Sequence, residues 1–481
     1  MKIAPNFSIN KGFEPQSFKA EQQKTATAAN LQQKPVPAPT LLAYMLGKSP
    51  KTQSLNIKFY NSPSISELNS KYGEIARKDI TELAQRASKP GQVLNWIESL
   101  PAEQLKRLDE IYALADSMKK NGGKKLGIIG IGGSKHTIEN LLSLNGKSDN
   151  IIFLSAVDPE SMDKFVEKLG DLKGASIMIA SKSGTTLEPS TGYEYVEKKF
   201  VEKFKNDYIA AGLNENEAQK AAKTEAAMHF VSITDKNPQA SRLRKISEEK
   251  GYKTGVIHDD CGGRFGAFDD HALTALAYSG MSKEDMKKML QSAQKAQKKF
   301  LSADINNNPA AQRALFNADC ILKGKTNQYD YYFGDRFEGT KLWNTQMKKE
   351  SHKALYKPAD LIGPEFLHNS TESDLDSGNT NSFYTFNTIK NDGTNDYKAY
   401  NALVGGSLKA YSQRHPVSVI EFKDFSPETI GEYVELKHFE AIYTGMFSRS
   451  LKGAAHPQVL PEVEQPNVKI YKREVESLLK A

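Results

Sequence analysis

The stretch MIASKSGTTLEPS, residues 178–190, places hydroxyl side chains and a lysine directly after an apolar run. The run ASIMIAS is too short for a helix and is typical of a buried strand, whereas the residues from EPSTGYEYV onward have helical periodicity. A strand-to-helix loop presents backbone N–H groups at a helix N-terminus, where the helix dipole favours an anion. The loop predicts a phosphate site, with an ordinary polar turn capped by a threonine as the alternative. The candidate ligands are Ser181, Lys182, Ser183, Thr185 and Thr186.

A second loop ends the stretch GIIGIGGS, Gly127 to Ser134. Its glycines permit close approach of the backbone to a ligand, and Gly133 and Ser134 are the candidate contacts. The dinucleotide-binding fingerprint requires a third glycine where Lys135 stands, so an NAD-dependent enzyme is disfavoured. Loops that follow neighbouring strands of one parallel sheet open on the same edge. The two loops together predict a phosphorylated small molecule as the ligand.

A third segment, DDCGGRFGAFDDHALTALAYSGM, places Arg264 after two glycines and before a helical run. An arginine on a tight turn offers a rigid fork of donors to an oxyanion and stays charged throughout a reaction. A surface arginine or a structural ion pair is the alternative.

Short apolar runs alternate with helical stretches and must position these loops. They are KKLGIIGIGGS, NIIFLSAV, ASIMIASKSGTT, AMHFVSITD and KTGVIHDD, and a less regular set follows at DYYFGD, KALYKP and PVSVIEF. This alternation predicts βαβ units with mainly parallel sheets covered by helices on both faces. The expected fold class is α/β, with two αβα-sandwich subdomains, a helical N-terminal segment and a C-terminal helix.

Composition suggests five segments. We expect a disordered N-terminal arm at 1–41, rich in Gln, Lys, Ala and Pro, and a helical segment at 42–121 that packs on the α/β core. The first α/β domain, which binds the ligand, is expected at 122–281 and the second at 282–455, followed by a C-terminal segment at 456–481.

The overall composition excludes several functional classes. The net charge of +7 arises from 65 basic and 58 acidic residues dispersed along the chain, which does not indicate nucleic-acid binding. No apolar run approaches the roughly 20 residues of a membrane-spanning helix, and the N-terminus lacks the apolar core of a secretory signal. The cysteines, Cys261 and Cys320, have no metal-ligand spacing and indicate a reducing compartment, so we expect a cytoplasmic protein.

Five ordered motifs resemble those of the glucose-6-phosphate isomerase family, also called the phosphoglucose isomerase family. They are GIGGS, SKSGTT, GGRF, QMKKES at Gln346 to Ser351, and EQPNVKIYKREV near the C-terminus, so the resemblance covers roughly residues 120–475. It implies a reversible aldose–ketose isomerisation of glucose 6-phosphate and fructose 6-phosphate through an enediolate, with no metal and no cofactor.

The resemblance also assigns roles to individual residues. Glu350 matches the family's base, which moves a proton between adjacent carbons, and Arg264 matches the cation near the developing oxyanion. Lys472 matches the lysine at the ring oxygen, and Gln465 is its neighbouring contact. The two loops match the phosphate-binding groups, and Gln346 matches the glutamine of the base motif.

A histidine completes the catalytic set that the resemblance implies. His368, in PEFLHNS, is the best match, and His352 is a competitor two residues after the base. In the family this histidine reaches the active site of the adjacent subunit, so the resemblance implies a homodimer with shared active sites.

Two other functions stay open at this point. One is an isomerase for a related sugar phosphate such as mannose 6-phosphate or an aminosugar phosphate, although no residue for handling ammonia can be named. The other is a non-catalytic sugar-phosphate sensor, for which Glu350 would have no use.

Overall fold

The computed structural model describes residues 54–480 except 98, 148 and 391–393. The arm expected at 1–41 lies outside the described residues, which all belong to the unit Val36–Ala481.

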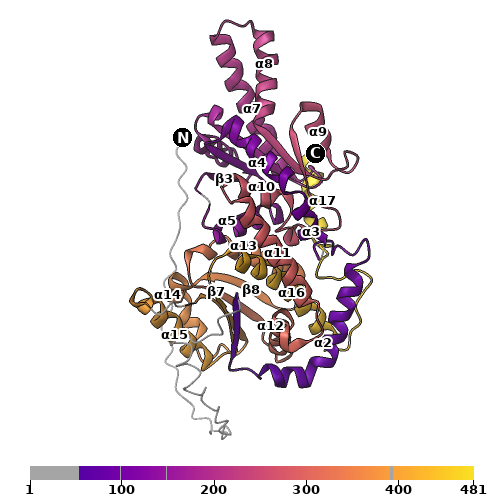
Figure 1. Ribbon diagram of the computed structural model, residues 1–481, viewed down its shortest axis with the longest axis vertical. Coiled ribbons are helices and arrows are strands. Elements are labelled where there is room, and N and C mark those ends of the chain that lie inside the picture. The colour runs from indigo at the N-terminus through magenta and orange to yellow at the C-terminus, as the bar shows by residue number, and fades with distance from the viewer. Residues whose placement is uncertain (1–53, 98, 148, 391–393, 481) are drawn as a thin grey trace, which may run out of the picture. The chain divides into compact units, whose positions relative to one another are not determined.

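The first sheet consists of parallel strands only (Figure 1). They are β2 (Lys125–Ile129), β3 (Ile151–Leu154), β4 (Ala175–Ala180), β5 (Phe230–Thr234) and β6 (Lys253–Val256), in the order β3-β2-β4-β5-β6. All six residues of β4 are buried because helices cover both faces of the sheet. The strands expected from the apolar runs of this half are confirmed.

Successive residues of β4 contribute to two separate cores. Met178 belongs to the larger core together with residues of α4 (Leu108–Gly122) and α10 (Asp270–Tyr278). Ile177 and Ile179 belong to a second core with residues of α6 (Pro159–Leu169) and α7 (Leu187–Ala210). This alternation is the expected consequence of the two-residue period of a strand.

The second sheet is parallel except at one edge. Its strands are β7 (Asn327–Tyr332), β8 (Lys357–Ile362), β9 (Ser382–Ile389), β10 (Val417–Phe422) and the antiparallel β1 (Leu55–Tyr60), in the order β1-β10-β9-β7-β8. The expected strands do not include β9, and β1 lies within the segment expected to be helical. Of the expected strand KALYKP only the last two residues lie in β8, and the residues before them form a turn. The prediction of two mainly parallel α/β units is confirmed.

Helices also cover both faces of the second sheet (Figure 1). One face packs on α12 (Pro309–Leu322) and α16 (Pro427–Ser450), and the other on α15 (Lys398–Ser412). The remaining α-helices are α2 (Ile65–Ala87), α3 (Ser99–Lys106), α5 (Gly133–Leu144), α8 (Glu215–Met228), α9 (Arg242–Lys250), α11 (Lys283–Phe300), α13 (Thr340–His352), α14 (Gly363–Asp374) and α17 (Val468–Lys480). The short 3₁₀ turns are η1 (Leu172–Gly174), η2 (Gly263–Phe265), η3 (Ile305–Asn307), η4 (Asp335–Phe337) and η5 (Asn395–Tyr397).

Helix α13 connects the two halves. It follows β7 in the second half and packs against α5 of the first half. At the start of α13, a Cβ atom on Gly339 would lie 2.1 Å from the carbonyl oxygen of Glu139 on α5, so the two backbones are in direct contact. Within the described part of the chain, no helix has the length and apolar character needed to span a bilayer.

Candidate active site

The two polar loops lie at the carboxyl edge of neighbouring strands. Strands β2 and β4 pair directly, and GIGGS follows β2 while SKSGTT follows β4. If the five strands of this sheet are numbered 1 to 5 along the chain, they lie side by side in the order 2-1-3-4-5. The direction in which successive strands are added to the sheet therefore reverses between β2 and β4. Open α/β sheets bind ligands at such a reversal, outside the carboxyl ends of the strands.

The glycine loop is packed against the arginine loop. A Cβ atom on Gly133 would lie 2.3 Å from the carbonyl carbon of Gly263 and 2.7 Å from the backbone nitrogen of Arg264. Only a hydrogen at this position allows the two backbones to approach so closely. The contact places Ser134 beside the turn that carries Arg264.

The SKSGTT loop ends at the N-terminus of α7, where donor groups are available. Thr186 is the N-cap residue but makes no side-chain capping hydrogen bond, so the first N–H groups of α7 are not satisfied by it. The other hydroxyls shape the loop: Ser181 Oγ accepts from Gly184 N at 3.2 Å, and the Ser183 and Thr185 hydroxyls lie 2.8 Å apart. Partly exposed hydroxyls at a helix N-terminus form a suitable site for a phosphate.

Lys182 supplies the positive charge of this loop. Its Nζ donates to the carbonyl oxygen of His258 at 3.3 Å. The His258 ring is itself fixed, because its Nδ1 lies 2.6 Å from Asp269 Oδ1. Burial lowers the pKa of His258, but the hydrogen bond and charge of Asp269 outweigh burial and raise the pKa above its ordinary value. Lys182 Nζ is therefore hydrogen-bonded to the main chain of a residue whose own ring is held in place, just after the end of β6.

Glu350 lies on α13 with both carboxylate oxygens hydrogen-bonded. Oε2 accepts from Arg264 Nη1 at 3.0 Å and from Gln465 Nε2, and Oε1 accepts from Gln346 Nε2 at 2.8 Å. Gln346 in turn lies next to the GIGGS loop, since a Cβ atom on Gly132 would be 3.2 Å from Gln346 Nε2. The side chain of Glu350 remains 23% exposed, so the carboxylate is held in place and is still accessible.

Arg264 is almost completely buried, with 1% of its surface exposed. Its Nε donates to Ser351 Oγ at 3.1 Å, and its Nη2 donates to the carbonyl oxygen of Glu462. Burial lowers the pKa of Arg264 from its ordinary value, and the negative charge of Glu350 opposes that lowering. Arginine remains protonated in proteins, so a fixed cation lies next to the carboxylate.

This arrangement provides the groups needed for proton transfer next to a carbonyl. A carboxylate can act as a base, an adjacent guanidinium can stabilise negative charge on oxygen, and an anion site can anchor a substrate at a distance. The structure brings Glu350, Arg264, Gln346 and Gln465 together in one hydrogen-bonded group.

The structure does not bring the other two predicted catalytic residues into this group. His368, on α14, and Lys472, on α17, are exposed, and neither forms a hydrogen bond or ion pair with a described residue. The competitor His352 is buried, and its Nε2 lies 2.8 Å from the carbonyl oxygen of Ala441 on α16. Burial lowers the pKa of His352 to about 4, so its ring is neutral at neutral pH. His352 therefore belongs to the core.

Two site residues were not predicted from the sequence. Ser351 directly follows Glu350 within its motif, and a hydroxyl at this position is a signal that was available. Glu462 contacts Arg264 through its main-chain carbonyl, a group that every residue has, so its side-chain type gave no signal.

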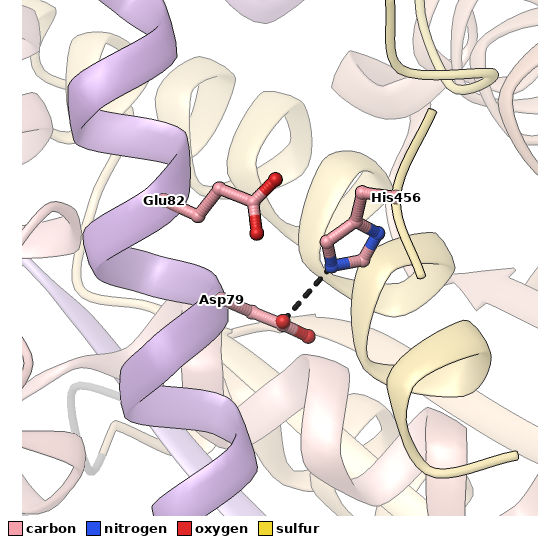
Figure 2. A group of neighbouring side chains, drawn as sticks. All are labelled: Asp79, Glu82 and His456. Carbon is pink, nitrogen blue, oxygen red and sulfur yellow. Dashed lines mark hydrogen bonds and ion pairs between the residues drawn. The ribbon is translucent and has the colours of Figure 1, made fainter. Parts of the chain in front are cut away.

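Among the residues that the structure describes, two groups have the composition of metal ligands, but their donor atoms are already used. In the first, Asp79, Glu82 and His456 lie together (Figure 2), and Arg449 Nε donates to His456 Nδ1. His456 Nε2 must therefore carry the ring proton, and it lies 2.9 Å from Asp79 Oδ1.

The second group consists of His258, Asp269 and Asp270. Both ring nitrogens of His258 face carboxylates, Asp269 at 2.6 Å and Glu103 at 3.3 Å. Asp270 is held by Arg107 through two hydrogen bonds. Neither group offers a histidine lone pair to a metal ion.

Comparison with known proteins supports one family. The model of the phosphoglucose isomerase family matches residues 104–326, slightly less than half of the chain. A glucose-6-phosphate isomerase of Bacillus cytotoxicus is 30% identical over 245 residues, which are 48% of this chain and 49% of that protein. One of Shouchella clausii is 25% identical over 438 residues, or 84% of this chain and 90% of that protein. The chain thus spans about half the length of the first relative and most of the second.

Solved structures support the fold. A hypothetical protein of Thermus thermophilus superposes with a TM-score of 0.72 at 19% identity, covering 89% of this chain and 100% of that chain. A glucose-6-phosphate isomerase of Chlamydia trachomatis superposes with a TM-score of 0.66 at 18% identity, covering 89% of this chain and 88% of that chain. The family model and the named relatives show that this chain is similar to the phosphoglucose isomerase family, and the solved structures share its fold.

Proposed function

We propose that this protein is a glucose-6-phosphate isomerase that interconverts glucose 6-phosphate and fructose 6-phosphate. The observation that carries the proposal is the pairing of Glu350 with the buried Arg264, together with the SKSGTT loop, where Thr186 makes no side-chain capping hydrogen bond at the N-terminus of α7. The names of the relatives support the same reaction.

In the proposed reaction, Glu350 removes a proton from C2 of the open-chain sugar, and the electron pair moves toward the carbonyl oxygen at C1. Arg264 stabilises the negative charge of the resulting enediolate. Glu350 then returns the proton to C1 while the hydroxyl proton of O2 passes to O1 and C2 becomes the carbonyl carbon, so the carboxylate is regenerated and no external electron donor or acceptor is consumed. The SKSGTT loop holds the phosphate and fixes the distance between the base and the reacting carbons.

Ring opening is the remaining step of the proposed reaction. We assign it to Lys472 at the ring oxygen and to His368, with Gln465 as the neighbouring contact of Lys472, by resemblance to the family. His368 is exposed, which is compatible with a role in the active site of a second subunit, so a homodimer with shared active sites is part of the proposal. A cytoplasmic location and a mechanism that needs neither metal nor cofactor complete it.

The test is conversion of fructose 6-phosphate to glucose 6-phosphate by the purified protein, followed with a coupled dehydrogenase. Activity supports the proposal. Absence of activity, with fructose 6-phosphate still raising the unfolding temperature, favours the non-catalytic sensor. If mannose 6-phosphate is converted and fructose 6-phosphate is not formed from glucose 6-phosphate, the enzyme acts on the related sugar.

Replacing Lys182 with Ala should mainly weaken substrate binding. A charge-assisted hydrogen bond to phosphate is lost, so KM for fructose 6-phosphate should rise roughly 10- to 100-fold, with a smaller change in kcat. The matched control is Lys198→Ala, which removes an exposed lysine of α7 that pairs with Glu202. An unchanged KM in Lys182→Ala would contradict the assignment of this loop.

A further inference from the structure

Glu462 contacts two different parts of the protein, one through its main chain and one through its side chain. Its carbonyl oxygen accepts a hydrogen bond from Arg264 Nη2. Its carboxylate, which is 1% exposed, accepts from Arg449 Nη1 at 2.6 Å and from Arg449 Nη2 at 2.7 Å. The two-bond geometry fixes both the position and the orientation of the Glu462 side chain.

Helix α16 is shaped to receive this carboxylate. A Cβ on Gly445 would lie 2.0 Å from Glu462 Oε1, so the glycine leaves the space that the carboxylate fills. Arg449 lies one helical turn after Gly445 on the same helix. A buried ion pair contributes little net stability, because desolvation offsets its attraction. Its more specific effect is to fix geometry.

The third guanidinium nitrogen of Arg449 is also hydrogen-bonded. Its Nε donates to His456 Nδ1 at 3.3 Å, and the same ring contacts Asp79 on α2 through Nε2 (Figure 2). Ser450 Oγ donates to the same oxygen of Asp79 at 2.9 Å. Arg449 is therefore bonded through all three guanidinium nitrogens, to Glu462 on one side and to His456 on the other.

The segment around Glu462 is tied to the base as well. Lys353 Nζ donates to the carbonyl oxygen of Glu350 at 3.2 Å and to that of Pro461. Three residues after Glu462, Gln465 Nε2 donates to Glu350 Oε2, the oxygen that also receives Arg264 Nη1. Movement of this segment would therefore displace two of the three side chains that contact the carboxylate of Glu350.

We propose that the Glu462–Arg449 ion pair, seated over Gly445, is a positioning element that holds Arg264 and Gln465 against Glu350. The inference rests on the proposed isomerase function and adds residues that contact no substrate themselves. It predicts that loss of the pair slows the chemical step and leaves phosphate binding at the SKSGTT loop largely intact.

The experiment is a double-mutant cycle of Glu462→Gln and Arg264→Lys, measured by steady-state kinetics with fructose 6-phosphate. Glu462→Gln alone should lower kcat roughly 10- to 100-fold, while KM changes less than about threefold. In the Arg264→Lys background the same substitution should lower kcat by a clearly smaller factor, because one of the two groups that it positions is already altered. A purely structural effect would instead reduce activity by the same factor in both backgrounds, and that result would overturn the inference.

The matched control is Glu432→Gln on α16, which removes an ion pair to Lys299 that is 3.3 Å in length. It should leave kcat within about twofold of wild type.

If Glu462→Gln does not fold, Arg449→Lys replaces it, since lysine keeps the charge and loses the two-bond fork. The same pattern in the cycle supports the inference, and equal losses in both backgrounds overturn it. An inactive wild type would overturn the proposed function and this inference together, whereas an active wild type with an additive cycle overturns only the inference.

Discussion

Replacing Glu350 with Gln should lower kcat by roughly 10²- to 10⁴-fold, the range for loss of a general base. The substitution keeps the size of the side chain and removes its ability to accept a proton. It also disturbs the local hydrogen bonds, because the three donors from Arg264, Gln346 and Gln465 would face an amide with one acceptor oxygen. The kinetics should be measured with fructose 6-phosphate at saturation.

Measurements of ligand binding distinguish the loss of the base in Glu350→Gln from the disturbance of the local hydrogen bonds. Fructose 6-phosphate should still raise the unfolding temperature of the variant, because the SKSGTT loop is unchanged. The control Glu338→Gln removes an acidic side chain just before α13 that pairs with Lys341, and it should behave as wild type. Turnover of Glu350→Gln at the wild-type rate would remove Glu350 from the mechanism.

The second large effect is expected at Gly133. Alanine would place a methyl group 2.3 Å from the carbonyl carbon of Gly263 and 2.5 Å from its oxygen, and backbone atoms cannot rotate away as a side chain can. Gly133→Ala should therefore lower the free energy of unfolding by about 3 kcal/mol or more. It should also lower kcat/KM severely, because the turn that carries Arg264 must move away from the loop that carries Ser134. Chemical denaturation and steady-state kinetics measure the two effects.

Gly406→Ala is the matched control for Gly133→Ala. Gly406 lies in α15, and a Cβ there would meet no atom within 4 Å. Alanine has the higher helix propensity, so this variant should raise the free energy of unfolding by about 0.5–1 kcal/mol with unchanged activity. Equal stability of Gly133→Ala and wild type would mean that the two loops are not in contact.

The loops of the first half could be predicted because their signals are local. An apolar run followed by glycines or hydroxyls marks a strand end, and the carboxyl edge of a parallel sheet brings such ends together. The strand β1 gave a weaker signal, since LNIKFY mixes polar and apolar residues and only its two end residues are buried. The pairing of Arg264 with Glu350 came from the family resemblance alone, because it joins residues 86 positions apart.

Other features of the site depend on atoms that residue types do not reveal. The carbonyl of Glu462 orients Arg264, and the absence of a side chain at Gly445 makes room for the Glu462 carboxylate. The roles of Lys472 and His368 stay predictions, because neither residue is bonded to the group around Glu350 in the described structure.

The edge strand β1 determines how early the second sheet can be completed while the chain is being synthesised. Among the described strands it pairs only with β10, and the hydrogen bond between Asn56 and Glu421 on these strands spans 365 positions. At roughly 5–20 residues per second, a ribosome needs on the order of 20–70 s to make the chain between these partners. The first sheet, whose strands all fall between Lys125 and Val256, can form in that interval. The second sheet must close last, and until then β1 is a strand without its partner.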